Sequence, residues 1–380
     1  MTSPSDNGRN AACADCASRG LLLAGLASHI DRSVSGRAGS RARELLALDD
    51  ETLARLLSPD DPAAPLRRAR SQDAHERLRS ALDTGGCWST CVHRATYPAS
   101  LNALGGARPR ALFARGRAAA LSDAAVELTV TVVGSRRAGA YGRDVAHELG
   151  RLLAGSGITV VSGLALGVDS AAHEGALAGA GTTVAVLGTG PERSYPRSRH
   201  RLYERIHASG VVISELPPGT PTFRWMFPAR NRIMAAMAAL TVVVEAAERS
   251  GSLITAEMAI EGGRQVGAVP GPVNSWRSGG ANRLLADGAA VIRDARDVLD
   301  LLLGPGAELP SPVGPELDEV AVQVLDAVEG GASAPGAVAN AARLPFPRAQ
   351  AALGRLERDG YVRSDAAGRY ARTSQRPPGR

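Results

Sequence analysis

Lysine is absent from this chain: all 44 of its basic residues are arginine. Any contact with a phosphate must therefore come from arginine or from backbone N–H groups. Alanine and glycine are abundant as well, which indicates a GC-rich bacterial genome as the main cause of the bias. Against 38 acidic residues the arginines leave a formal charge of +6, which is compatible with a polyanionic partner.

The chain also lacks a segment that would cross a membrane. The apolar stretch 21–27 is too short to span a bilayer. Asp6 and Asp15 precede it, so it also makes a poor signal-peptide core. We expect a cytoplasmic protein with no membrane partner.

Cysteine is scarce and occurs in two local pairs, Cys13 with Cys16 and Cys87 with Cys91, with His93 close behind. Two such pairs can build a zinc site. However, a long stretch of chain separates them, and the first pair lies in a polar N-terminus that we expect to be disordered. We therefore favour reduced thiols, as in other cytosolic proteins, with a structural metal as the alternative.

Strand and helix patterns alternate through the middle of the chain. Amphipathic stretches such as 141–154, 168–179 and 254–262 predict helices, and the unbroken apolar runs between them predict strands buried on both faces. The predicted strands are 128–133, 158–161, 183–187, 211–214, 240–245, 266–269 and 290–292. This order predicts an α/β fold with an extended Rossmann-like, doubly wound parallel sheet.

Turns that contain glycine or serine follow several of these strands. Each such turn brings backbone N–H groups and a helix N-terminus to the carboxyl end of its strand, where doubly wound folds bind phosphates. We therefore predict one DNA- or phosphate-binding site along this edge of the sheet. Its predicted residues are Gly134, Ser135, Arg136, Ser162, Gly163, Gly167, Gly188, Gly190, Tyr195, Arg197, Arg230, Asn231, Arg232, Ser250, Gly251 and Ser252.

Aromatic residues make up only 3% of the chain, yet five of them gather among arginines in one stretch. They are Tyr195, Tyr203, Phe223, Trp225 and Phe227. Aromatic side chains stack on bases and guanidinium groups hold phosphates, which suits single-stranded nucleic acid. Burial of the same aromatics in the core explains the pattern equally well.

Two further patterns bear on catalysis and cofactors. Asp169 and His173 lie four residues apart at a helix start, where capping and packing are more common roles than a catalytic pair. The chain has no G-x-G-x-x-G turn with a spaced acid and no G-x-x-x-x-G-K-[ST] loop. We predict no cofactor.

Composition divides the chain into segments. Proline and glycine breaks mark a linker, and three helical patterns followed by two short strands predict a winged helix. We predict a disordered segment at 1–18, a helical (SAM-like) module at 19–83, an extended Rossmann domain at 84–303, a linker at 304–314, a winged-helix domain at 315–372 and a disordered tail at 373–380.

The chain resembles the DNA-processing protein A (DprA/Smf) family in seven segments that occur in the same order. They are VGSRRAGAYG, SGLALGVDSAAHEGAL, TVAVLGTGPERSYP, ISELPPG, FPARNRIMA, VVVEAAERSGSLITAEMA and VPGPVNSWRSGGANRLLADGA. The resemblance is dense over 128–292, extends back to Tyr97-Pro98 and fits the C-terminal winged helix. The cysteines are not part of the family pattern.

This resemblance implies a cytoplasmic homodimer that binds single-stranded DNA, protects incoming strands during natural transformation and helps to load the RecA recombinase. It implies no catalytic turnover. Arg136 matches a DNA-contacting arginine of the family, and Arg197 stands where many members have lysine. We expect the RecA surface within 240–300. The apolar residues Met226, Ile233, Met234 and Met237 are a further indication of a subunit or partner contact.

Two other functions fit parts of the pattern. A Rossmann-type phosphoribohydrolase would use Arg230 and Glu245 on a nucleoside monophosphate, although the P-G-G-x-G-T-x-x-E signature of such enzymes is absent. A transcription regulator would use the third helix of the winged helix. That helix carries Arg348, Arg355 and Arg358 but also acidic residues.

Overall fold

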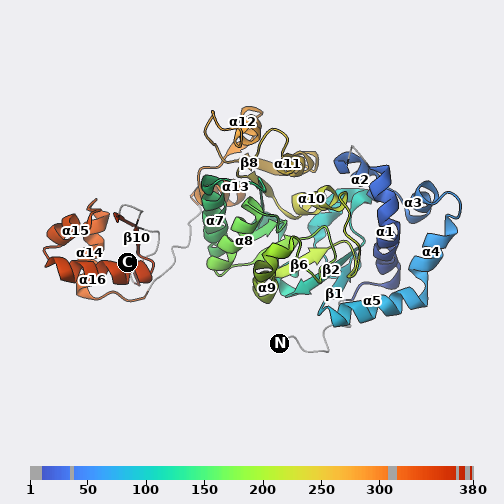
Figure 1. Ribbon diagram of the computed structural model, residues 1–380, viewed down its shortest axis with the longest axis horizontal. Coiled ribbons are helices and arrows are strands. Elements are labelled where there is room, and N and C mark those ends of the chain that lie inside the picture. The colour runs from blue at the N-terminus through green and yellow to red at the C-terminus, as the bar shows by residue number, and fades with distance from the viewer. Residues whose placement is uncertain (1–10, 35–37, 307–314, 365–367, 373–376, 379–380) are drawn as a thin grey trace. The chain divides into compact units, whose positions relative to one another are not determined.

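The computed structural model describes residues 11–34, 38–306, 315–364, 368–372 and 377–378. The chain folds into two compact units, Met1–Ala307 and Glu308–Arg380, so that the division falls within the predicted linker (Figure 1). Most of that linker and of the predicted C-terminal tail lies outside the described residues, as do residues 1–10.

Five helices open the larger unit and gather at one end of it (Figure 1). They are α1 (Ala14–Ser33), α2 (Ala38–Ala47), α3 (Asp50–Leu57), α4 (Ala63–Arg70) and α5 (Gln72–Thr84). The predicted helical module is therefore present, but it starts earlier than expected. The prediction of disorder over 1–18 is wrong for residues 11–18, because Cys16 and Ala17 are buried in a cluster with Phe113.

These helices share a core with the sheet domain. Leu22, Leu26 and Ile30 of α1 are buried together with Trp225 and Met226. The indole Nε1 of Trp225 donates a hydrogen bond to the carbonyl oxygen of Ala27 at 3.0 Å. The burial of these side chains stabilises the contact between the helical module and the sheet domain, by about 25 cal/mol for each Å² of apolar surface removed from water.

The main sheet has nine strands in the order β1-β2-β6-β5-β4-β3-β7-β8-β9. They are β1 (Trp88–Cys91), β2 (Ala111–Gly116), β3 (Thr129–Val133), β4 (Thr159–Ser162), β5 (Thr183–Val186), β6 (Val211–Ser214), β7 (Leu240–Val243), β8 (Gln265–Ala268) and β9 (Ala290–Val291). All seven predicted strands are confirmed. The sequence analysis missed β1 and β2, which extend the sheet in antiparallel pairing beyond β6.

The parallel part of the sheet has one topological switch point. The chain winds outward from β3 through β4 and β5 to β6, then returns to place β7 on the other side of β3. Strands β8 and β9 continue outward from β7. In doubly wound sheets, ligands bind outside the carboxyl ends of the strands at such a point, here between β3 and β7.

Helices cover both faces of this sheet. The principal ones are α7 (Ala140–Gly155), α8 (Val168–Ala178), α9 (His200–Ser209), α10 (Met226–Met237) and α11 (Gly251–Glu261). Alternate strand residues belong to different cores, since Val184 packs with Met234 of α10 whereas Ala185 packs with Tyr203 of α9. The shorter elements are η1 (Ala99–Ala107), α6 (Ala119–Ser122), η2 (Val126–Leu128), η3 (Arg197–Arg199), α12 (Gly279–Ala286) and α13 (Ala295–Leu303).

The smaller unit has the predicted winged-helix order of three helices and a hairpin. Its elements are α14 (Glu319–Glu329), α15 (Pro335–Ala341), α16 (Phe346–Arg358), β10 (Val362–Ser364) and β11 (Tyr370–Arg372). Its core is its own, with Val324, Val338, Leu353 and Leu356 buried together. Arg355 of α16 pairs with Asp318 at 2.6 Å, so this arginine is already engaged within the unit.

Candidate nucleic-acid interface

A cavity of about 480 Å³ opens at the switch point of the sheet. It lies where the turns after β3 and β7 meet the start of α10 and α11. Half of the predicted site residues line it: Gly134, Ser135, Arg136, Arg230, Asn231, Ser250, Gly251 and Ser252. The structure thus brings together residues that are far apart in the sequence.

A second cavity, of about 210 Å³, adjoins the first. Gly163, Gly188 and Tyr195 of the predicted set line it. Both cavities are lined by Arg136 and Phe227, so they lie side by side. We call the two cavities together the trough.

Aromatic and guanidinium groups stack along the trough. The rings of Tyr195 and Phe227 lie 4.8 Å apart between centroids. The guanidinium of Arg136 lies 5.8 Å from the centroid of Phe227. Tyr195 is 45% exposed, whereas Trp225 and Tyr203 are buried in the core. Burial in the core therefore explains Trp225 and Tyr203, whereas Tyr195 and Phe227 line the trough and are available to a ligand.

Arg230 forms the floor of the trough. It is buried, and its guanidinium donates hydrogen bonds to the carbonyl oxygens of Gly163 and Val186. Its Nη2 lies 3.8 Å from a carboxylate oxygen of Asp169. Burial lowers the pKa of Arg230 to about 10, an effect that Asp169 partly offsets.

Asp169 completes this buried pair from the first turn of α8. Its carboxylate accepts hydrogen bonds from the backbone N–H groups of Gly163 and Ala165, at 3.2 and 3.4 Å. Burial raises the pKa of Asp169 above its usual range, against the lowering effect of Arg230. The pair fixes the turn after β4, so Asp169 has a structural role, although its side chain bonds to this turn and does not cap α8. Arg230 positions the backbone of this site rather than presenting a free charge.

The N-terminus of α11 provides donors at the rim. The hydroxyl of Ser250 caps this helix by accepting from the N–H of Ser252 at 3.4 Å. Asn231 holds the same turn, since its side-chain amide donates to the carbonyl oxygen of Gly251 at 3.4 Å. First-turn N–H groups and the helix dipole attract anions, so this end of the trough suits a phosphate.

Three predicted residues serve the architecture instead. The hydroxyl of Ser162 is buried and donates to the carbonyl oxygen of Val132 at 2.6 Å. Gly167 has a positive φ of 80°, and a Cβ there would collide with the carbonyl oxygen of Ser135. Gly190 packs against the backbone of Pro217 in the same way. None of the three lines the trough.

Two predicted arginines also lie outside the trough lining. Arg197 is exposed in η3, close in sequence to Tyr195. Arg232 is buried, donating to both carboxylate oxygens of Glu215 at 2.7 Å and to the carbonyl oxygen of Ala107 at 2.9 Å. Its guanidinium is saturated by these partners, so the structure does not bring Arg232 to the predicted site.

Phe227, one of the five aromatic residues that the sequence singles out, lines the trough. Sequence reasoning missed two other trough residues. Trp276 lines it and is 63% exposed, with the guanidinium of Arg277 4.9 Å from its ring centroid. Exposed Arg137 also lines it, directly after Arg136. A signal was present for both, because each stands in one of the motifs that follow a strand.

Glu245 does not act as a free carboxylate. It is buried at the end of β7, and it accepts a hydrogen bond from the N–H of Gly139 at 3.0 Å. Gly139 is the N-cap of α7, so the carboxylate stabilises the N-terminus of that helix. The phosphoribohydrolase hypothesis needs Glu245 and Arg230 at a substrate, and both are occupied by backbone groups.

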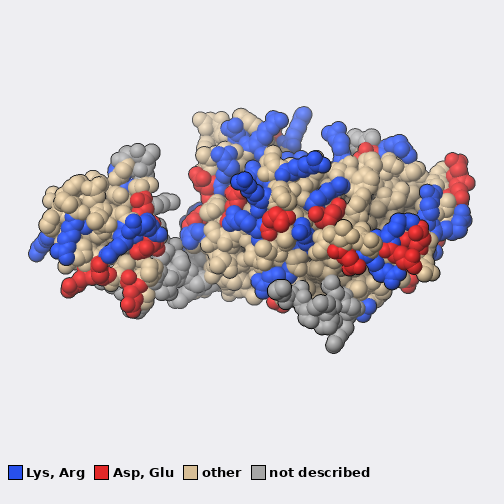
Figure 2. Space-filling model, turned by 60° about the horizontal axis from the view of Figure 1, so that its bottom comes forward, with Lys and Arg blue, Asp and Glu red and all other residues tan. Residues whose placement is uncertain are grey.

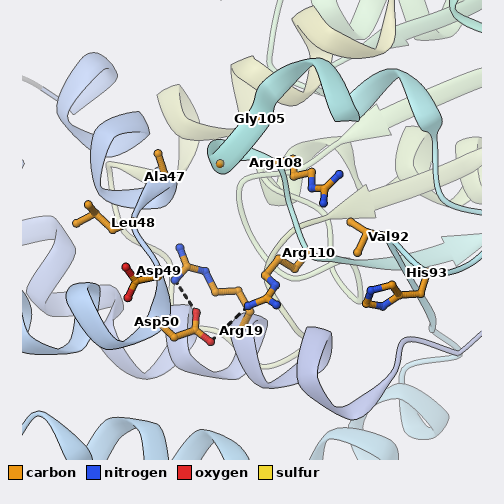
Figure 3. A pocket seen from close by; sticks show the side chains of 11 residues that line it. Arg19, Ala47, Leu48, Asp49, Asp50, Val92, His93, Gly105, Arg108 and Arg110 are labelled. Carbon is orange, nitrogen blue, oxygen red and sulfur yellow. Dashed lines mark hydrogen bonds and ion pairs between the residues drawn. The ribbon is translucent and has the colours of Figure 1, made fainter.

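A larger cavity, of about 590 Å³, lies between the N-terminal helices and the loops near β1 and β2. Figure 3 shows Arg19 and Arg110 pointing toward the carboxylate of Asp50 in this cavity. The distances to Asp50 are 2.8 Å from Arg19 and 3.8 Å from Arg110. Despite its size, this cavity shares no lining residue with the trough, and its charges are partly neutralised, so we favour the trough as the site.

The wider surface carries mixed charge. In the space-filling view, arginine side chains lie across the central part of the larger unit with acidic side chains between them (Figure 2). Such a surface attracts a polyanion weakly at long range. Close binding then depends on local groups such as those of the trough.

Comparison with known proteins decides the family. The sequence profile of the DNA recombination-mediator protein A family matches residues 88–303. The chain belongs to this family. It is 38% identical over 323 residues to the putative DNA processing protein DprA of Mycobacterium tuberculosis, covering 83% of this chain and 76% of the relative.

Other relatives agree with this assignment. Protein Smf of Escherichia coli is 36% identical over 67% of this chain and 69% of its own length. The crystal structure of DprA from Streptococcus pneumoniae superposes with a TM-score of 0.55 at 35% identity, covering 66% of this chain and 86% of that one. The family match includes β1 and β2 and every strand of the trough.

Within the part of the chain that the structure describes, no helix combines the length and the apolar character that crossing a bilayer requires.

Proposed function

We propose that this member of the recombination-mediator family binds single-stranded DNA in the trough. The observation that carries the proposal is the stack of Tyr195, Phe227 and Arg136 beside the N-terminus of α11. Bases stack on exposed aromatic rings regardless of sequence, and guanidinium and backbone N–H groups hold the phosphates between them.

The chemistry of the trough favours single strands over duplex. In a duplex the base faces are already stacked on one another, so Tyr195 and Phe227 would have no free base face to contact. The exposed Arg136 and Arg137 and the N-terminus of α11 would contact the backbone of either form. The aromatic contribution therefore discriminates between the two forms.

A solved relative supports this assignment. The chain superposes on DNA processing protein A from Helicobacter pylori with a TM-score of 0.50 and 29% identity, covering 54% of this chain and 92% of that one. That structure is described as revealing a single-stranded DNA binding mode. We extend the same ligand class to this chain.

We further propose that the protein acts without catalytic turnover, as a homodimer that protects incoming strands and passes them to the RecA recombinase. The engagement of both Arg230 and Glu245 with backbone groups supports the first part. Family membership supports the second. The winged helix would then contact a partner or serve as a secondary DNA contact.

The test is a titration of labelled single-stranded and duplex oligonucleotides with the purified protein at several salt concentrations. We expect tight, length-dependent binding to single strands of any sequence and much weaker binding to duplex. The logarithm of affinity should fall with the logarithm of salt concentration, with a slope of about −0.7 per phosphate contact. Nucleoside monophosphate hydrolysis, monitored in parallel, should stay at background.

A Tyr195→Ala variant sharpens this test. Loss of one stacking platform costs about 1–3 kcal/mol per base, so single-strand affinity should fall about tenfold while the weak duplex affinity hardly changes. Equal affinity of the wild-type protein for duplex and single strand would refute the proposal, as would affinity independent of salt.

A further inference from the structure

Three of the four cysteines converge with one histidine on a single point of the larger unit. Cys13 caps the N-terminus of α1, and Cys16 lies in its first turn. Cys91 ends β1, and His93 follows it by two residues. The ligand atoms of these four side chains all lie within 4.8 Å of one another.

Four of the six distances between these atoms are close to those of a tetrahedral metal site. Zinc bonds of about 2.3 Å to sulfur and about 2.0 Å to nitrogen place ligand atoms about 3.5–3.8 Å apart at the corners of a tetrahedron. The Sγ atoms of Cys13 and Cys91 are 3.9 Å apart. Nδ1 of His93 lies 3.4, 3.6 and 4.0 Å from the Sγ atoms of Cys13, Cys16 and Cys91.

We propose that Cys13, Cys16, Cys91 and His93 bind a structural zinc ion. Three cysteines with one histidine are one of the common ligand sets of structural zinc sites, here with a C-x-x-C pair on one segment and a C-x-H pair on the other. All four tetrahedral positions are filled by the protein. This leaves no position for a water or a substrate, so the ion is structural and not catalytic.

The surroundings of the cluster suit thiolate ligands. The backbone N–H of Cys13 donates to Sγ of Cys91 at 3.5 Å, the kind of outer hydrogen bond that stabilises a metal-bound sulfur. A zinc ion with three thiolates and one neutral imidazole carries one net negative charge. This charge lies at the N-terminus of the 20-residue helix α1, where the helix dipole is favourable.

Disulfide formation does not explain this arrangement. A disulfide joins two sulfurs at about 2.05 Å, and the structure holds all four cysteines as free thiols. A disulfide would also not call for an imidazole nitrogen close to three sulfurs. Zinc is favoured over the other first-row metals because thiolate and imidazole ligands in a tetrahedral arrangement are typical of it.

The ion would clamp the start of the chain to the edge of the sheet. Strand β1 is the last strand on its side, and two contacts already join its region to the same segment. The N–H of Ala12 donates to the hydroxyl of Ser89 at 3.2 Å, and Arg94 donates to the carbonyl oxygen of Ala11 at 2.9 Å. The zinc ion would also fix the orientation of α1. Arg19 of this helix and His93 both line the cavity shown in Figure 3.

The expectation of unconnected reduced thiols is thereby revised. It depended on a disordered N-terminus and on the long stretch of chain between the two cysteine pairs. The structure instead folds residues 11–16 against β1. It turns Cys87 away, with its Sγ donating to the carbonyl oxygen of Gly85 at 3.4 Å.

The test measures metal in untagged full-length protein purified without chelator, by inductively coupled plasma mass spectrometry. We expect zinc at one equivalent per chain. After exchange with cobalt, the protein should show the visible absorption of tetrahedral thiolate-bound Co²⁺. Metal-free protein with free thiols that takes up neither ion would overturn the proposal, as would a disulfide among Cys13, Cys16 and Cys91.

Variants locate the site. His93→Ala changes an exposed residue, so the fold should survive while the affinity for zinc falls by at least tenfold. His93→Cys completes a set of four thiolate ligands and should restore zinc binding. Cys87→Ser is the matched control and should retain a full equivalent of zinc. Full zinc content in both His93→Ala and Cys16→Ser would place the metal elsewhere and overturn the assignment.

A structural readout accompanies the metal analysis. Removal of zinc with a strong chelator should speed hydrogen exchange in residues 11–20 and 88–94 and lower the melting temperature. The same chelator should leave the Cys16→Ser variant unchanged. Exchange that stays equally slow in chelated wild-type protein would contradict the clamp.

Discussion

At the scale of single residues, the two arginines that line both cavities of the trough differ in their exposure to solvent. Arg136 is exposed and contacts Phe227, whereas Arg230 is buried against two carbonyl oxygens and Asp169. Truncating Arg136 opens no core cavity and leaves no buried charge unpaired. We therefore expect the two positions to separate DNA binding from stability.

The Arg136→Ala variant should lose affinity for single-stranded DNA by about tenfold or more, with its melting temperature close to that of the wild type. Its salt slope should be less steep by about 0.7, for one lost phosphate contact. Arg79→Ala removes the same charge from the exposed face of α5 and serves as the control. If both variants bind equally well, Arg136 is not in the interface.

The Arg230→Ala variant should lose stability first. Removing one partner of a buried ion pair costs about 3–5 kcal/mol, because the carboxylate of Asp169 would remain buried without its counter-charge. Chemical denaturation of this variant measures the loss directly. An Arg230→Ala protein as stable as the wild type, but defective in DNA binding, would show that this guanidinium contacts DNA itself.

His173 provides a pH-dependent element of stability. It is fully buried, and burial lowers its pKa to about 3, with Arg230 adding to the effect. Thr183 donates its single hydroxyl proton to the carbonyl oxygen of Val160, so Nδ1 of His173 must donate to Thr183, at 2.7 Å. Nε2 is then the unprotonated nitrogen, and it has no hydrogen-bond partner among the described residues.

Below about pH 6.5 the unfolded chain takes up a proton at this histidine and the folded chain does not. This contribution to stability is therefore present above that pH and is lost as the pH falls toward 3, by about 1.4 kcal/mol per pH unit. A His173→Phe variant, unfolded by denaturant between pH 7 and 4.5, should show a shallower decline than the wild type. Parallel curves for the two proteins would contradict the assignment.

Sequence alone places residues correctly on the sheet edge where a motif fixes both the turn and its position after a strand. Gly134 to Arg136 and Ser250 to Ser252 follow β3 and β7, the two strands at the switch point, and the structure brings them together. Arg232 lies away from the trough because residues two apart on a helix point to different sides. Sequence alone does not show that Glu215 pairs with one of them.

At the scale of elements, the winged helix is separable from the trough. It has its own hydrophobic core, and every residue that lines the trough belongs to the larger unit. A protein ending at Gly304 should fold and retain most of its single-strand affinity. Circular dichroism checks the fold and an oligonucleotide titration checks the affinity; a folded fragment that no longer binds would place the main site in the winged helix.

The same scale shows which elements a sequence reveals. The seven strands found in advance lie between amphipathic helices, and most of them are part of unbroken apolar runs, which are strong signals. Strand β1, with the sequence Trp88-Ser-Thr-Cys91, is as long as most of them, but half of its residues are polar and no amphipathic pattern marks it. It forms because β2 offers it an antiparallel edge, and that edge depends on long-range pairing with β6.

At the scale of the whole molecule, the apolar residues whose sequence pattern suggests a subunit contact are buried. Met226, Ile233, Met234 and Met237 are each at most 2% exposed, because α10 lies between the sheet and the N-terminal helices. The apolar pattern therefore gives no support to a dimer, which stays a prediction from family resemblance. Exposed apolar side chains occur instead on α11 and β9, within the predicted partner region 240–300.

We predict that the protein is a homodimer and that this region contributes to its interface. Ile260 of α11 is 58% exposed, and Val291 of the edge strand β9 is 52% exposed. Edge strands and exposed apolar residues are common places for association. Light scattering should give the mass of a dimer for the wild type and a lower mass for Val291→Asp. Leu56→Asp, at a similarly exposed leucine of α3, should remain dimeric.

If two protomers join their troughs into one path, the monomeric variant should also lose affinity for long oligonucleotides more than for short ones. A wild-type monomer with undiminished affinity for long strands would refute this arrangement.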